Sequence, residues 1–111
     1  MKYTIRVFCA EGGKLPYMDW LRGIKDQKAR IAIRLRIDRM EEGNFGRVEP
    51  VGEGVSELKI DLGPGYRIYF GMIGKTVVLL LYGGDKKTQG KDIKVAKQYF
   101  RDYKAREKED G

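Results

Sequence analysis

Histidine is absent from the 111-residue sequence, and this absence excludes several kinds of enzyme. Ser-His-Asp and Cys-His nucleophile systems both need an imidazole as the general base, so neither can be built from this chain. Acid-base chemistry must instead use Lys, Glu, Asp or Tyr, and a developing negative charge must be stabilised by Arg or Lys.

Cysteine is nearly absent as well, because Cys9 is the only one. A single cysteine forms no internal disulfide and cannot supply a thiolate zinc site. We expect Cys9 to be a small, buried apolar residue, and we expect the protein to need no metal and no cofactor. A lone thiol is compatible with the reducing cytoplasm, where we expect the protein to be located.

Long apolar runs are missing too. Residues 1–13 lack the apolar run of a signal peptide, and no segment is apolar over the length that spans a bilayer.

Acidic residues are outnumbered by basic ones: the sequence has 16 Asp and Glu and 23 Lys and Arg, which gives a formal charge of +7. Such an excess favours a polyanionic partner, with nucleic acid first and an acidic membrane surface or protein second.

Length and hydrophobic pattern predict one α+β domain over residues 1–111, with a polar tail from about residue 105. The expected order is strand, two helices, three antiparallel strands and a final helix, with the helices packed on one face of the sheet. The expected strands are 2–10, 56–62, 66–73 and 76–83, and the expected helices are 15–24, 27–43 and 93–106.

The helix at 27–43 has the clearest signals. Asp26 can cap its N-terminus and Gly43 can end it. Ile31 and Leu35 widen its apolar arc past half the circumference, which predicts packing against both the sheet and a neighbouring helix. The glycine-rich residues that follow, up to residue 55, are expected to form a connection.

Strand alternation divides residues 66–70 into two sets. Tyr66, Ile68 and Phe70 point to one face, and Arg67 and Tyr69 point to the other. Because the apolar set should face the helices, we expect the second set on an open face of the sheet.

The preceding strand adds a matching polar set on the same face: Glu57, Lys59 and Asp61. Lys59 is an expected cross-strand neighbour of Arg67. Cations beside tyrosine rings suit a single nucleic-acid strand. The alternative is an ordinary polar sheet surface in which Arg67 pairs with Glu57 or Asp61, and the alternation alone leaves both interpretations open.

A specific motif carries a family resemblance. G-x-G-Y-R-x-Y-F at residues 63–70, followed by GGDKKTQ at residues 83–89, resembles the RelE/ParE superfamily of toxins from type II toxin–antitoxin systems. The resemblance extends over nearly the whole chain and is greatest to the HigB-like branch, the addiction-module killer proteins. It implies a curved antiparallel sheet of about four strands, with two N-terminal helices on one face and a C-terminal helix.

The resemblance also implies an enzymatic activity: metal-independent, ribosome-dependent cleavage of messenger RNA, an mRNA interferase. In that reaction the RNA 2′-hydroxyl attacks the adjacent phosphate. Carried over by position, Arg67 contacts the scissile phosphate, Lys59 is a basic residue of the preceding strand, and Lys86 or Lys87 is the basic residue of the loop before the last helix. Glu57 or Lys59 is expected to help deprotonate the 2′-hydroxyl.

Two positions depart from the RelE pattern. Asp61 replaces a second strand lysine, and we expect it to orient Arg67. Asp92 or Ile93 stands where RelE has a tyrosine, so an aromatic ring that stacks on an RNA base would have to come from another residue. Candidates are Tyr66, Tyr69, Tyr82 and Tyr99. Lys91 and Lys94 either form a solvated helix face or bind the RNA backbone.

The partners implied by the resemblance are a helix-turn-helix antitoxin, messenger RNA and the 70S ribosome, without a membrane or a small-molecule cofactor. Two alternatives stay open. One is a ParE-like toxin that inhibits DNA gyrase by protein–protein contact. The other is a catalytically inactive homologue that only binds an antitoxin.

Overall fold

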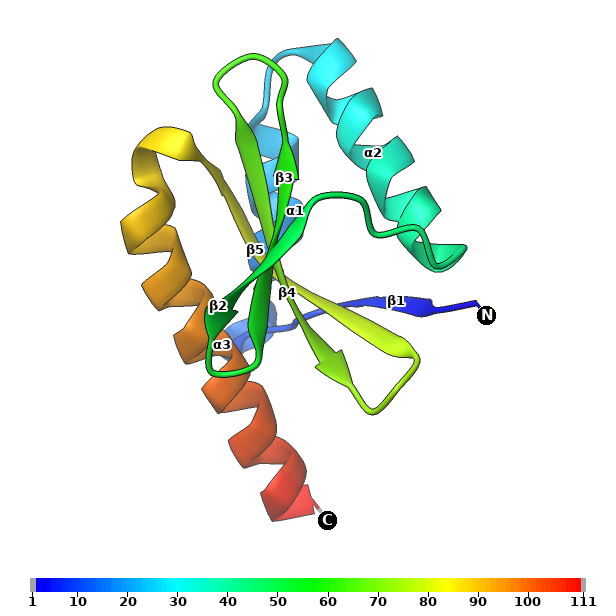
Figure 1. Ribbon diagram of the computed structural model, residues 1–111. Helices are drawn as coiled ribbons and strands as arrows, with labels where there is room; N and C mark the ends of the chain where they lie inside the picture. The colour runs from blue at the N-terminus through cyan, green and yellow to red at the C-terminus, as the bar shows by residue number, and fades with distance from the viewer. Residues whose placement is uncertain (1, 111) are drawn as a thin grey trace.

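The computed structural model describes residues 2–110, which form a five-stranded sheet with three α-helices (Figure 1). The elements are β1 (Thr4–Val7), η1 (Glu11–Gly13), α1 (Pro16–Gly23), α2 (Gln27–Glu41), β2 (Val48–Gly52), β3 (Val55–Ile60), β4 (Tyr66–Ile73), β5 (Val77–Asp85), η2 (Lys86–Thr88) and α3 (Gln89–Asp110). None of the helices in this described part is both long and apolar enough to cross a membrane.

The sheet has the strand order β1-β5-β4-β3-β2. The predicted α+β class and the antiparallel pairing of β3, β4 and β5 are confirmed. The prediction of about four antiparallel strands is wrong in two respects. β1 pairs with β5 in parallel. The sequence did not reveal this, because the alternation of side chains within a strand carries no information about the direction of its neighbour. β2 forms within the expected connection, where Pro50 is tolerated because β2 is an edge strand.

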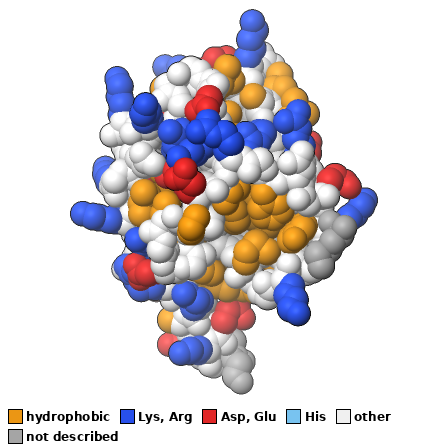
Figure 2. All heavy atoms as spheres, in the orientation of Figure 1, with side chains coloured by type: hydrophobic (Ala, Val, Ile, Leu, Met, Phe, Trp, Pro, Cys, Tyr) orange, Lys and Arg blue, Asp and Glu red, His pale blue; other side chains and the backbone are white. Residues whose placement is uncertain are grey.

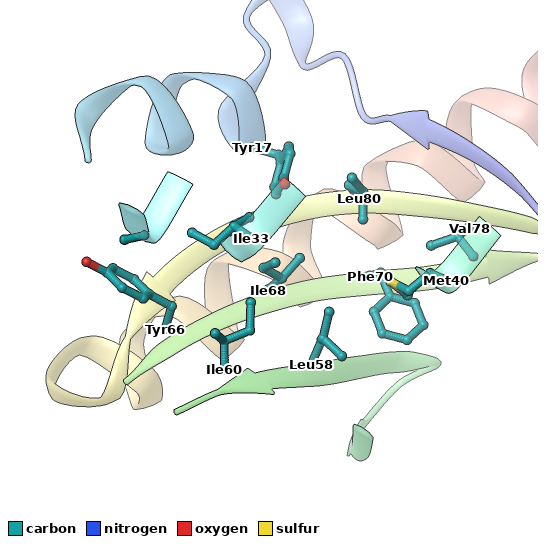
Figure 3. Packing of buried hydrophobic residues seen from close by; sticks show 11 residues of the cluster. Tyr17, Ile33, Met40, Leu58, Ile60, Tyr66, Ile68, Phe70, Val78 and Leu80 are labelled. Atoms are coloured by element: carbon teal, nitrogen blue, oxygen red, sulfur yellow. The ribbon is translucent and has the colours of Figure 1, made fainter. Parts of the chain in front are cut away.

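The first face of the sheet is covered by α1 and α2. Ile33 and Met40 of α2 are fully buried against Leu58, Ile68 and Leu80 of the sheet (Figure 3). The predicted cap is confirmed. Asp26 accepts hydrogen bonds from the backbone N–H groups of residues 28 and 29, which would otherwise have no partner in the first turn of the helix.

The second face is covered by α3. Ala96 and Phe100 of α3 pack on Tyr69, Leu79 and Leu81, all of which are buried. The prediction that all helices share one face is therefore wrong. β4 and β5 are apolar on both faces, so each face must be covered to remove its side chains from water.

Three further side chains lie where the sequence did not place them. Ile31 and Leu35 on α2 are 53% and 51% exposed, so the apolar arc in contact with the rest of the protein is narrower than predicted. Cys9 is exposed rather than buried, because it follows the end of β1. The exposed Ile31 and Leu35 leave an apolar surface on the outer side of α2.

Gly71 on β4 lets Phe100 of α3 approach the sheet backbone. A Cβ atom at Gly71 would lie 2.6 Å from Cζ of Phe100. We expect Gly71→Ala to lower the free energy of unfolding by about 1–3 kcal/mol, the usual cost of adding atoms to a well-packed core. Urea denaturation followed by circular dichroism measures this change. Gly90→Ala on α3, where a Cβ meets open space, is the matched control and should be neutral or stabilising. Equal stability of the two variants would contradict the close packing.

Candidate functional site

Arg67 lies on the face of β4 that α3 covers, and its side chain is only 8% exposed. Its Nε lies 3.7 Å from Oε1 of Glu57, and its Nη1 donates to the carbonyl oxygen of Tyr66 at 3.1 Å. The predicted register is confirmed, because Lys59 and Arg67 are Cα partners. The prediction that this face is open is wrong at Glu57 and Arg67, since both are buried.

The buried carboxylate of Glu57 connects the sheet to the start of α3. Its Oε2 accepts a hydrogen bond from Nε2 of Gln89 at 2.8 Å. Glu57 is 1% exposed, so an RNA hydroxyl cannot reach it in this structure, and the expected role in proton removal is not supported. Its contacts suit a different role: Glu57 holds the guanidinium of Arg67 in place.

Tyr69 is fully buried, with 0% exposure. Its ring therefore cannot stack on an RNA base, and the prediction that it contacts RNA is wrong. Burial, together with the nearby carboxylates of Glu57 and Asp92, raises the pKa of Tyr69. Neither its hydroxyl nor Nε of Arg67 has a hydrogen-bond partner among the described residues.

Arg67 and Lys86 line one hollow, which we call the phosphate hollow. Its volume is about 330 Å³, and its lining consists of Asp61, Leu62, Gly63, Pro64, Gly65, Arg67 and Lys86. The turn between β3 and β4 is tied to η2, because the backbone N–H of Lys86 donates to the carbonyl oxygen of Gly65 at 2.9 Å. A Cβ atom at Gly65 would lie 3.5 Å from Nη1 of Arg67, which places the outer end of the guanidinium at this turn.

Asp61 and Lys59 have other ion-pair partners than expected. Asp61 pairs with Arg47, so the prediction that it orients Arg67 is wrong. Nζ of Lys59 lies 2.9 Å from Oε1 of Glu49 on β2. The hydrogen bond from Lys59, followed by its charge, lowers the pKa of the Glu49 carboxyl. Figure 2 shows a band of Lys and Arg side chains across this view, with acidic side chains beside it.

The remaining predicted lysines lie apart from the phosphate hollow. Lys87 and Lys94 are exposed and do not line it. Lys91 is exposed and lines a second hollow beside it. Of the predicted cations, the structure thus brings Arg67 and Lys86 together, with Lys59 next to Arg67 in the sheet register.

Sequence reasoning missed Arg47 and Gln89. Gln89 belongs to the motif at residues 83–89, but its contact with Glu57 depends on α3 covering that face of the sheet. Arg47 precedes β2, a strand that the glycine-rich pattern concealed. Among the described residues, no group of three Cys, Asp or Glu side chains is placed to hold a metal ion.

The Glu57–Arg67 pair yields a test by double-mutant cycle. Replacing only Arg67 by Met leaves a buried carboxylate without its cation, which we expect to lower the free energy of unfolding by about 3–5 kcal/mol. The double variant Glu57→Gln, Arg67→Met should recover much of this loss, because no buried charge remains. Urea denaturation of the wild type, both single variants and the double variant measures the coupling. Strictly additive effects would show that the two side chains do not interact.

Comparison with known proteins gives a relative but no family description. No family model matches the chain. A protein of Haemophilus influenzae, described as an uncharacterized protein, is 47% identical over 83 residues. The aligned part covers 75% of this chain and 84% of that protein. At this identity and coverage, the chain belongs to the same family as the Haemophilus influenzae protein.

Proposed function

We propose that this protein is a toxin of the RelE/ParE type that cleaves messenger RNA. The observation that carries the proposal is the phosphate hollow beside the β3–β4 turn, which Arg67 and Lys86 both line. Two cationic side chains that line one hollow can stabilise the charge that develops on a phosphate under attack. The net charge of +7 supports a polyanionic substrate.

The proposed reaction is an internal transfer that needs no external nucleophile. The RNA 2′-oxygen forms a bond to phosphorus while the bond to the 5′-oxygen of the next nucleotide breaks, leaving a 2′,3′-cyclic phosphate and a 5′-hydroxyl. Among the residues that line the phosphate hollow, Asp61 is the one carboxylate, so we assign it the 2′-hydroxyl proton; its Oδ2 pairs with Arg47, which leaves Oδ1 for this role. Lys86 can supply the proton that the leaving 5′-oxygen requires.

Arg67 acts in this scheme as a fixed electrostatic group. Nε of the guanidinium pairs with Glu57, and Nη1 donates to the carbonyl oxygen of Tyr66 at the turn, so both contacts fix the group where it lines the hollow. A cation fixed in this way loses little entropy when the transition state forms. The neighbouring Lys59 and Arg47 are each paired with a carboxylate, so Arg67 and Lys86 are the cations proposed to contact the RNA phosphate. Binding through these charges should weaken as the salt concentration rises.

The proposed setting is the bacterial cytoplasm, with the ribosome presenting the message and a helix-turn-helix antitoxin as the controlling partner. The outer surface of α2 supports a protein partner. Ile31 and Leu35 are exposed there, beside Arg30 and Arg34. An antitoxin segment with apolar anchors and acidic flanks would complement this surface.

One observation favours a second function. Arg67 is mostly covered, whereas Ile31 and Leu35 are open to a partner. A ParE-like inhibitor of DNA gyrase, acting by protein–protein contact, would use the second feature and would not need the phosphate hollow.

Lys86→Glu tests the nuclease proposal without disturbing the core, because Lys86 is exposed. Induction of the wild type should arrest growth and produce new 5′ ends within translated messages. We expect the variant to reduce these ends by about 100-fold or more, the usual effect of losing one preorganised charge contact. Mapping of RNA 5′ ends after induction measures the change.

Lys108→Glu is the matched control, because it makes the same charge change at an exposed position near the end of α3. It should cleave as the wild type does. Growth arrest with intact messages and lost DNA supercoiling would favour gyrase inhibition instead. Absence of arrest with a folded protein would favour the inactive, antitoxin-binding homologue.

A further inference from the structure

A second hollow lies between α1, the β3–β4 turn and the start of α3, and we call it the aromatic hollow. Its volume is about 550 Å³, within the range of small-molecule sites. The aromatic side chains that line it are Trp20, Tyr66 and Tyr82, and Gly83 and Gly84 allow Trp20 and Asp92 to approach the strand closely. Trp20 packs directly on Gly83, where a Cβ atom would collide with the indole.

The hydroxyl of Tyr66 is directed into this hollow without a partner. Tyr66 is only 9% exposed and lines the hollow, and its hydroxyl makes no hydrogen bond within the described residues. Figure 3 shows its ring at the end of the core cluster, with the hydroxyl oxygen directed away from the other labelled side chains. The ring is largely buried while the hydroxyl stays accessible at the hollow, so a ligand there can use its donor and acceptor.

The hollow is acidic, although the protein is basic. Asp26 and Asp85 flank Tyr66, and both raise its pKa by their charge, after the larger effect of burial. Each uses Oδ1 to cap a helix, which leaves Oδ2 free. Asp92 also lines the hollow and accepts a hydrogen bond from Thr88. Such a surface repels phosphate and attracts N–H donors.

The two hollows are neighbours. Pro64 lines both hollows. Tyr66 lines the aromatic hollow and the next residue, Arg67, lines the phosphate hollow; Asp85 and Lys86 are divided between the two hollows in the same way. Tyr66 and Asp85 are Cα partners across β4 and β5, so these two pairs of residues lie side by side. A nucleotide whose phosphate occupies the phosphate hollow can therefore direct its base into the aromatic hollow.

We propose that the aromatic hollow binds the nucleobase next to the bound phosphate and selects guanine; the placement of that phosphate rests on the proposed function. Guanine presents two adjacent N–H donors, N1–H and the 2-amino group, which match carboxylate oxygens. Its O6 accepts a hydrogen bond, and Lys25 and Lys91 at the hollow can donate one. Uracil offers a single N–H between two carbonyl oxygens, which carboxylates repel. Aromatic side chains add contact with the base plane.

Trp20 is the only tryptophan, so its fluorescence reports directly on the aromatic hollow. Titration with guanosine 5′-monophosphate should change this fluorescence at concentrations about tenfold lower than uridine 5′-monophosphate requires, the discrimination typical of one good base contact. Free tryptophan amide under the same titration corrects for absorption by the nucleotide. Equal responses to the two nucleotides, or no response to either, would overturn the inference.

A double variant, Asp26→Asn with Asp85→Asn, removes both flanking charges while Asn keeps the two helix caps. It should lose the preference for the guanine nucleotide and keep its circular dichroism spectrum. Asp38→Asn, on the exposed side of α2, is the control and should keep the preference. Retained preference in the double variant would show that the carboxylates do not select the base.

The binding assay uses no ribosome, so it separates this inference from the proposed nuclease. Selective guanine binding without RNA cleavage in cells would contradict the nuclease and support the hollow as a nucleotide site. Cleavage in cells with neither guanine selectivity in the titration nor guanine bias at the cut sites would support the nuclease and overturn the inference.

Discussion

The contact on which the site depends is the buried pair of Glu57 and Arg67, placed between the sheet and α3. A charge in such a place is stable only with its partner, since removal from water is unfavourable for either ion alone. Gln89 binds the same carboxylate from the first residue of α3. The Glu57 side chain thus joins β3, the guanidinium of Arg67 and the start of α3. A movement of α3 away from β3 would therefore change the contacts that position the guanidinium. The preorganisation of Arg67 and the docking of α3 have a common cause.

Charge is distributed unevenly around the end of β4 and β5. Positive groups gather at the phosphate hollow, and carboxylates gather at the aromatic hollow on the other side of Pro64. The net charge of +7 describes neither hollow. A uniformly basic surface would attract any polyanion, whereas the nucleotide binding that we propose depends on a basic and an acidic hollow that adjoin.

Local sequence signals predicted much of the fold. Alternation in residues 66–70 assigned the correct side chains to each face, and the cap at Asp26 was recognised because its reason is local. β2 was missed because a short edge strand with proline and glycines gives no alternating signal. The position of α3 could not be read from its own pattern either, since an amphipathic helix does not specify which face of a sheet it covers.

The site was harder to predict than the fold. The sequence grouped Arg67 and Lys86 in one candidate site because both belong to one motif, and in the structure both line the phosphate hollow. Asp61 was assigned to the wrong cation, since its partner Arg47 precedes a strand that was not expected. The aromatic hollow combines Trp20 and Asp26 with residues more than 35 positions later in the chain, and such combinations arise only from tertiary packing.

Pro50 has an effect on how copies of this protein meet one another. β2 is an outermost strand, and such strands can recruit another chain by continuing the sheet. Proline has no N–H to offer an incoming strand, and the irregular register between Pro50 and Gly52 interrupts the row of backbone groups. This rim is therefore a poor template for the addition of another strand, and a second copy would have to bind elsewhere on the surface.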